Sequence, residues 1–224
     1  HCPNRSTLGI LTKDGCFAEY VTLPLSNLIE IPENVPDEQA VFVEPLAAGL
    51  EILEQMHIQP CQKVMVLGDG KLGLLTALAL NACGLDVLIV GKHQNKLDIA
   101  KNQGVKTQLL SEFEQAPKFD VVVEATGSIT GFETSVSCVK PRGTLVLKST
   151  IAASKELNLA PIVINEITIL GSRCGRFEPA MRLIASGKID FSQMISKIYP
   201  IEQAVEAFDA NNAKDTIKIL LKIG

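Results

Sequence analysis

The sequence has no C-x-x-C pair of cysteines and no apolar run long enough to cross a bilayer. Its six cysteines lie far apart, which argues against a disulfide framework and is typical of a reducing compartment. Asp69, Lys71 and Asp86 interrupt the longest apolar stretches, so we expect no transmembrane helix and no membrane partner. These absences together predict a cytoplasmic protein.

A basic surface is lacking as well. The chain has 21 Lys and Arg against 25 Asp and Glu, a net charge of −4, and its lysines are scattered. We therefore expect no nucleic-acid partner. There is no repeat and no low-complexity tract. At 224 residues and 46% hydrophobic, the chain is long enough for one large globular domain or one and a half ordinary ones.

A glycine-rich turn is the most informative feature that is present. Three glycines form the pattern G-x-G-x-x-G between an apolar strand at 64–67 and a helix predicted over 72–83. In a dinucleotide-binding fold these glycines permit the tight turn, the approach of a pyrophosphate, and the packing of the helix, whose N-terminus favours phosphate. The alternative is a tight turn that holds no ligand. The predicted cofactor-binding residues here are Gly68, Gly70, Lys71, Leu72 and Gly73.

The end of the next predicted strand, 87–90, bears on the choice of cofactor. NAD enzymes place Asp or Glu there to accept a hydrogen bond from the ribose 2′-hydroxyl. This sequence has Gly91, Lys92 and His93 instead. A missing carboxylate and a nearby cation favour a 2′-phosphate, so we predict that NADP is preferred over NAD. If Lys92 is an ordinary solvated lysine and Gly91 a turn residue, the selectivity is weak.

Apolar strands alternate with amphipathic helices from residue 45 onward. This alternation predicts an α/β fold with a doubly wound parallel sheet, the Rossmann type, covered on both faces. We expect strands at 64–67, 87–90, 107–110, 119–124, 143–148 and 167–171, with helices at 46–56, 72–83, 95–103, 130–139 and 178–186.

The two ends of the chain differ from this middle part. Each end is too small to form a core alone, so we expect them to pack together as the remnant of a second domain. The expected elements are β segments at 7–11, 17–23 and 28–31, a helix starting at Pro36, a helix at 202–210 and a closing strand at 217–223.

Six motifs occur in the order and spacing of one enzyme family. They are DGCFAEY (14–20), VEPLA (43–47), the glycine turn, FDVVVEATG (119–127), KPRG (140–143) and ILGSR (169–173). Through them the sequence resembles the zinc-dependent medium-chain dehydrogenase/reductase family of alcohol, sorbitol, threonine and glucose dehydrogenases. The resemblance implies a β-rich GroES-like catalytic domain, formed by both ends, beside the Rossmann domain. The implied domains are 1–44 (partial catalytic), 45–182 (dinucleotide-binding) and 183–224 (return to the catalytic domain).

The same resemblance implies an activity. It is hydride transfer between an alcohol or polyol, or its carbonyl product, and NAD(P), with zinc as a Lewis acid in the complete protein. The family takes its zinc-binding Cys and His from a segment upstream, so the chain looks N-terminally truncated, and we expect this part alone to be inactive. Two alternatives stay open: a zinc-free NADPH-dependent quinone or enone reductase, and a nucleotide-binding Rossmann protein without enzymatic activity.

Two residues match metal ligands of the family. Glu44 corresponds to a glutamate that reaches the catalytic zinc directly or through water. A carboxylate among apolar neighbours needs such compensation, although the dipole of the following helix is an alternative partner. Cys2 resembles the last cysteine of a structural zinc lobe, and it would bind only with cysteines upstream. Otherwise Cys2 is an ordinary cysteine.

Further cofactor contacts follow from matching positions. Two groups of residues end sheet strands at the carboxyl edge, where open α/β sheets bind ligands. For Thr126 and Ser149, capping of a strand end explains the sequence equally well. No catalytic acid or base is identified, because His57 follows a predicted helix and His93 a predicted strand, and neither is placed for that role. Glu51 stands where many relatives carry a histidine, so the proton relay of the family does not transfer to this sequence. The additional predicted cofactor-binding residues are Ala125, Thr126, Gly127, Lys148, Ser149, Thr150 and Arg173.

The apolar strand at 167–171 comes late in the sheet and is expected at its edge. Edge strands are usually paired or covered, and in the family such a strand often pairs across a dimer. We therefore predict a homo-oligomer.

Overall fold

The computed structural model describes residues 2–116, 118–150, 156–213 and 215–224. The chain divides into two compact units. One contains the residues up to Glu30 together with Met194–Gly224, and the other is Ile31–Gln193. The two ends of the chain therefore belong to one compact unit. The predicted division at 44/45 and 182/183 stays a prediction about functional domains.

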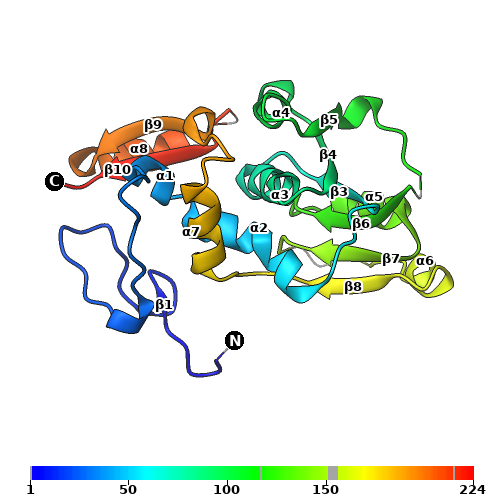
Figure 1. Cartoon of the computed structure of the whole chain (residues 1–224), viewed down its shortest axis with the longest axis horizontal. Helices are drawn as coiled ribbons and strands as arrows, with labels where there is room; N and C mark the ends of the chain where they lie inside the picture. The colour runs from blue at the N-terminus through cyan, green and yellow to red at the C-terminus, as the bar shows by residue number, and fades with distance from the viewer. Residues whose placement is uncertain (1, 117, 151–155, 214) are drawn as a thin grey trace. The chain divides into compact units, whose positions relative to one another are not determined.

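The larger unit is built on a six-stranded parallel sheet (Figure 1). Its spatial order is β5-β4-β3-β6-β7-β8, so the chain starts in the middle, winds to one edge, and then returns to wind to the other. This is the doubly wound Rossmann arrangement, and it confirms the predicted fold class. The strands are β3 (Lys63–Leu67), β4 (Asp86–Gly91), β5 (Lys106–Leu109), β6 (Phe119–Glu124), β7 (Val139–Leu147) and β8 (Thr168–Gly171).

The central strands are buried along consecutive residues rather than alternate ones. In β3 all residues from Val64 to Leu67 are buried, and β6 is buried from Val121 to Glu124. Continuous burial means that both faces of the sheet are covered. The helices of this unit are α1 (Asp37–Ala40), α2 (Val43–Gln55), α3 (Lys71–Ala82), α4 (Gln94–Lys101), α5 (Ile129–Cys138), α6 (Ala160–Ile164) and α7 (Phe177–Ala185).

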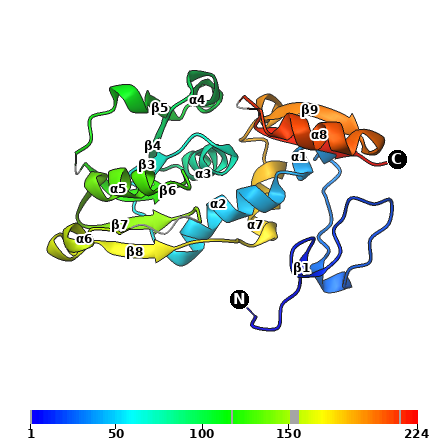
Figure 2. The same ribbon diagram turned by 180° about the vertical axis from the view of Figure 1, so that it is seen from behind.

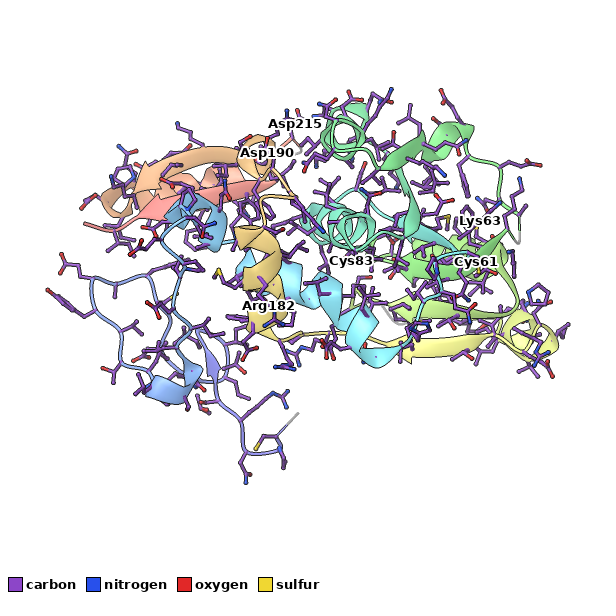
Figure 3. All side chains as sticks on the ribbon, viewed as in Figure 1. Cys61, Lys63, Cys83, Arg182, Asp190 and Asp215 are labelled. Carbon is purple, nitrogen blue, oxygen red and sulfur yellow. The ribbon has the colours of Figure 1, made fainter. Side chains whose placement is uncertain are left out.

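The amino ends of the central strands are held by one carboxylate. Lys63, which is labelled in Figure 3, begins β3, and its backbone N–H donates to Asp120 Oδ2 on β6 at 2.8 Å. The Lys140 ammonium on β7 donates to Asp120 Oδ1 at 3.0 Å. Three neighbouring strands are thus fixed in register at the end of the sheet opposite their carboxyl termini, where a ligand is expected.

The smaller unit has a parallel strand pair, β9 (Ile195–Pro200) and β10 (Lys218–Lys222), joined by α8 (Ala204–Asn211). Figure 2 shows α8 lying across this pair. The early part of the unit contributes only the two-residue strands β1 (Thr7–Leu8) and β2 (Thr12–Lys13).

The strands predicted at 17–23 and 28–31 are wrong. Among the described residues this stretch is irregular, apart from a 3-10 turn at Leu25–Asn27. Among the described residues no strand pairs with either segment, and the side chain of Tyr20 in the first is 90% exposed. Apolar alternation produces a strand only where a partner supplies the hydrogen bonds. Strand β9 and helix α6 were not predicted.

Candidate dinucleotide-binding site

A cavity of about 320 Å³ opens at the carboxyl ends of β3, β4 and β6. The direction of winding reverses between β3 and β6, and open α/β sheets bind ligands at this kind of switch point. The volume is at the lower end of the range for small-molecule sites. The lining residues are Leu67, Gly68, Asp69, Gly70, Val90, Gly91, Lys92, His93, Lys96, Leu110, Ala125, Thr126 and Ser128.

The glycine turn is shaped by close backbone packing. Gly68 has φ +119°, and a Cβ there would lie 2.7 Å from the Ala125 carbonyl oxygen. A Cβ on Gly73 would lie 2.0 Å from the Gly68 carbonyl oxygen, so α3 can pack here only with glycine. A Cβ on Gly70 would meet nothing within 4 Å. The three glycines therefore play different roles: two permit packing, and Gly70 keeps the backbone accessible.

Helix α3 begins at Lys71 with Gly70 as its N-cap, and no side chain caps its first turn. The first amides of a helix have no partner within the helix, and they attract anions. Lys71 is exposed and Leu72 is partly buried, and neither side chain lines the cavity. Their predicted contribution is through the backbone.

A carboxylate that sequence reasoning missed lies beside the end of β4. Asp69 Oδ2 accepts hydrogen bonds from the backbone N–H of Lys92 at 2.7 Å and of His93 at 2.6 Å. The His93 ring nitrogen Nδ1 lies 3.0 Å from the same oxygen. The predicted residues Gly91, Lys92 and His93 therefore line the cavity together with an acid from the glycine turn. The signal in the sequence is an aspartate inside G-x-G-x-x-G.

A second missed residue is Lys96 in α4. It is only 9% exposed and lines the cavity. Within the described ranges, no ion pair or hydrogen bond joins its ammonium to another residue. A cation on a cavity wall that has no protein partner among the described residues favours an anionic ligand. The position, three residues after His93 in a predicted helix, is the signal that could have identified it.

On the other side of the cavity, Glu124 organises the end of β6. Its fully buried carboxylate accepts from the Thr126 backbone N–H at 2.7 Å and from the Thr126 hydroxyl at 2.5 Å. The Ser149 hydroxyl donates to the other carboxylate oxygen and accepts from the Gly127 N–H at 2.9 Å. The structure thus brings Thr126, Gly127 and Ser149 together, with Thr126 and Ala125 lining the cavity.

Lys148 belongs to a separate polar cluster. Its ammonium donates to the Ser172 hydroxyl at 2.9 Å and to the Arg173 carbonyl at 3.0 Å. Burial lowers the pKa of Lys148 to about 8, although the negative charges of Glu51, Cys174 and Glu44 oppose that shift. Lys148, Thr150 and Arg173 do not line the cavity, and the Arg173 side chain is exposed.

The two predicted metal ligands are both exposed. Glu44 lies in the first turn of α2, so the expected apolar surroundings are absent, and the dipole of that helix stabilises its charge. Cys2 is a free thiol. No three His, Cys, Asp or Glu side chains of the described chain lie close enough to share a metal ion. These residues alone therefore do not fit a tetrahedral zinc centre.

Comparison with known proteins identifies relatives of this chain. The family model for zinc-binding dehydrogenases matches residues 72–186, which is more than half of the chain. D-xylulose reductase A of Aspergillus clavatus is 30% identical, over 93% of this chain and 63% of that protein. The chain thus spans less than two thirds of that relative's length.

Solved structures share the fold. A zinc-binding dehydrogenase from Sinorhizobium meliloti 1021, bound to NADP, is 28% identical with a TM-score of 0.88, over 98% of this chain and 69% of that one. An Escherichia coli CFT073 alcohol dehydrogenase complexed with NADH is 22% identical with a TM-score of 0.89, over 99% of this chain and 69% of that one. The fold therefore occurs with either dinucleotide.

Proposed function

Because the chain belongs to the zinc-binding dehydrogenase family, we propose that it is the nucleotide-binding part of an NAD(P)-dependent oxidoreductase. The proposed reaction moves a hydride between an alcohol or polyol, or its carbonyl product, and the nicotinamide. The observation that carries the proposal is the cavity at the switch point, lined by the glycine turn and by the ends of β4 and β6. The name of the Aspergillus relative, a D-xylulose reductase, supports a polyol substrate class.

The residues have distinct proposed roles. The backbone of Gly68–Gly73 and the start of α3 bind the pyrophosphate. Thr126, Gly127 and Ser149 bind and orient the nicotinamide half, and Glu124 holds them in place. The bound nicotinamide supplies the hydride chemistry.

The NADP preference is part of the proposal. Support comes from Lys92, His93 and Lys96 on the cavity wall. Strand β4 also ends at Gly91, so no carboxylate stands at that position. A 2′-phosphate would find positively charged and hydrogen-bonding groups at this position.

Zinc is proposed for the complete protein only, with Glu44 as a ligand directly or through water. The described residues do not form a zinc centre alone, so the remaining ligands would have to come from other parts of the complete protein.

Assembly and location are also proposals. Strand β8 is the outer strand of the sheet, and Ile169 on it is 41% exposed. Val163 and Ile164 on the preceding α6 are more than 70% exposed. Such an apolar edge supports a homo-oligomer formed through β8.

All six cysteines are free, which supports a reducing, cytoplasmic location. Among the described residues, no helix has the length and apolar character of a membrane span.

The first test is a titration of the purified chain with NADPH and with NADH, followed by nucleotide fluorescence. Saturable binding with a lower Kd for NADPH supports both the site and the preference. A lower Kd for NADH contradicts the preference only. If neither nucleotide binds a chain that circular dichroism shows to be folded, the glycine turn is structural and the proposed function fails.

A further inference from the structure

The side chain of Asp69 occupies the space that a residue at the end of β4 would normally use. A Cβ built on Gly91 would lie 2.5 Å from Asp69 Cβ, 2.6 Å from its Oδ2 and 2.7 Å from its Cγ. All three nearest atoms belong to this one side chain. An acid at position 91, the feature of NAD-binding folds, is therefore incompatible with Asp69 in its present position.

The register of the sheet explains why these two residues meet. Leu67 in β3 pairs with Val90 in β4, and both strands end within one residue of that pair. Asp69 leaves the glycine turn two residues after Leu67, directly beside Gly91. The acid nearest to the end of β4 therefore comes from the glycine turn and not from the strand itself.

The carboxylate of Asp69 is directed toward hydrogen-bond donors of the protein. Oδ2 accepts from two consecutive backbone N–H groups and from the His93 ring, and the Asp69 side chain is only 10% exposed. A carboxylate can only accept, so the His93 Nδ1 carries the proton in this contact. Oδ2 thus accepts from three protein donors, and Oδ1 lies 3.2 Å from the same ring nitrogen, so the carboxylate is held against protein groups although Asp69 also lines the cavity.

Three cationic or hydrogen-bonding side chains line the cavity beside Asp69, namely Lys92, His93 and Lys96. Lys92 is exposed, the His93 side chain is 40% exposed, and the Lys96 ammonium has no partner among the described residues. The position of Lys92 and His93 depends on the two backbone hydrogen bonds to Asp69.

We propose that Asp69 is a specificity-determining positioning residue for the adenosine ribose of the cofactor. Its side chain excludes a strand-end acid and holds the Lys92–His93 turn in the position that receives a 2′-phosphate. This inference rests on the proposed function, because it names how the same site chooses between two dinucleotides.

The steric exclusion is tested without any ligand, by thermal unfolding of three variants and the original chain. Gly91→Asp alone is expected to lower Tm, because the new side chain overlaps Asp69 and places two like charges together. Adding Asp69→Gly removes the three atoms nearest to the new Cβ and restores the net charge, so Tm is expected to recover. Adding Asp69→Ala instead keeps the Cβ at 2.5 Å from the new one and is expected not to restore Tm. Equal Tm values for Gly91→Asp and the original chain, or equal rescue by glycine and alanine, would overturn the exclusion.

The specificity part is tested by the ratio of Kd values for NADH and NADPH. Asp69→Gly is expected to weaken NADPH binding about tenfold, the scale of one lost hydrogen bond to a charged group, with a smaller effect on NADH. Asp69→Asn keeps an acceptor oxygen for the turn and is expected to retain the original ratio. The Asp69→Gly, Gly91→Asp double variant is expected to favour NADH. A selective loss of NADH binding in Asp69→Gly would show that Asp69 itself accepts from the ribose, and the proposal would be wrong.

Failure of the inference and failure of the proposed function give different results. If the original chain binds neither nucleotide, the proposed function fails, while the Tm series still reports whether Asp69 and Gly91 exclude one another. If the chain binds a nucleotide and the ratio of Kd values is unchanged across the variants, the proposed function stands and the role of Asp69 is rejected.

Discussion

The buried carboxylate of Glu124 holds both the backbone N–H and the hydroxyl of Thr126, two residues beyond it at the end of β6. This contact fixes the direction in which the chain leaves the sheet and enters the cavity wall. The hydroxyl of Ser149, at the end of the next strand, donates to the same carboxylate. One acid therefore sets the position of two strand ends.

Replacement of Glu124 is expected to affect both stability and binding. Glu124→Ala removes the acceptor of three hydrogen bonds, and we expect the free energy of unfolding to fall by about 2–3 kcal/mol. Glu124→Gln keeps the shape and one acceptor oxygen, so its effect is expected to be smaller. Chemical denaturation measures the first quantity, and nucleotide fluorescence measures the accompanying rise in Kd. The exposed Glu54→Gln on α2 is the matched control. Equal effects for Glu124→Ala and Glu54→Gln would contradict the role of Glu124.

The glycine turn offers a pair of substitutions that separates folding from binding. Gly73→Ala places a Cβ 2.0 Å from the Gly68 carbonyl oxygen, a backbone atom that cannot move away cheaply, so Tm is expected to fall steeply. Gly70→Ala has open space around its Cβ and a φ of −72°, so the fold is expected to survive. The new methyl group faces the cavity side of the turn, and nucleotide affinity is expected to drop. Unchanged binding by Gly70→Ala would show that the pyrophosphate lies elsewhere.

Lys96 is expected to contribute to affinity through its charge. Lys96→Met keeps the apolar length of the buried side chain and removes the ammonium, so Tm should change little. The Kd for NADPH is expected to rise about tenfold or more, and the Kd for NADH much less, if the ammonium contacts the 2′-phosphate. Lys101→Met on the exposed end of the same helix is the control. Equal changes for the two nucleotides would place Lys96 at the pyrophosphate or outside the site.

The α/β part of the fold could be predicted from sequence because its signals are local. Strands such as β6 and helices such as α3 appear as continuous apolar or periodic segments, and the structure places them within a few residues of expectation. The strands predicted at 17–23 and 28–31 are wrong because an apolar pattern does not tell whether a partner strand is present. Among the described residues, no strand pairs with either segment.

Only some of the residues that line the cavity could be predicted from the sequence. Gly91, Lys92 and His93 were found because their distance from the glycine turn is characteristic. Asp69 was missed because its role depends on the pairing of Leu67 with Val90, which joins residues 23 positions apart. Glu44 was expected among apolar side chains, but it lies in the first turn of α2 with its side chain exposed. Whether a side chain belongs to a binding site depends on its neighbours in the folded chain, which the sequence pattern does not give.

The buried ammonium of Lys148 predicts a pH dependence of stability. Burial lowers its pKa from 10.5 to about 8 in the folded chain, while the unfolded chain keeps the ordinary value. Between about pH 8 and pH 10.5 the unfolded state therefore binds more protons, and the contribution of this group to the free energy of unfolding rises with pH. Below pH 8 the ammonium is protonated in both states, so its unfavourable contribution to the free energy of unfolding is constant.

Lys148→Met removes the titrating group. The free energy of unfolding of the original chain minus that of this variant is expected to increase from pH 8 to pH 10.5. Urea denaturation at several pH values measures this difference, and Lys101→Met controls for general effects of alkaline pH. A difference that stays flat from pH 8 to pH 10.5 would show that the pKa of Lys148 is not lowered in the folded chain.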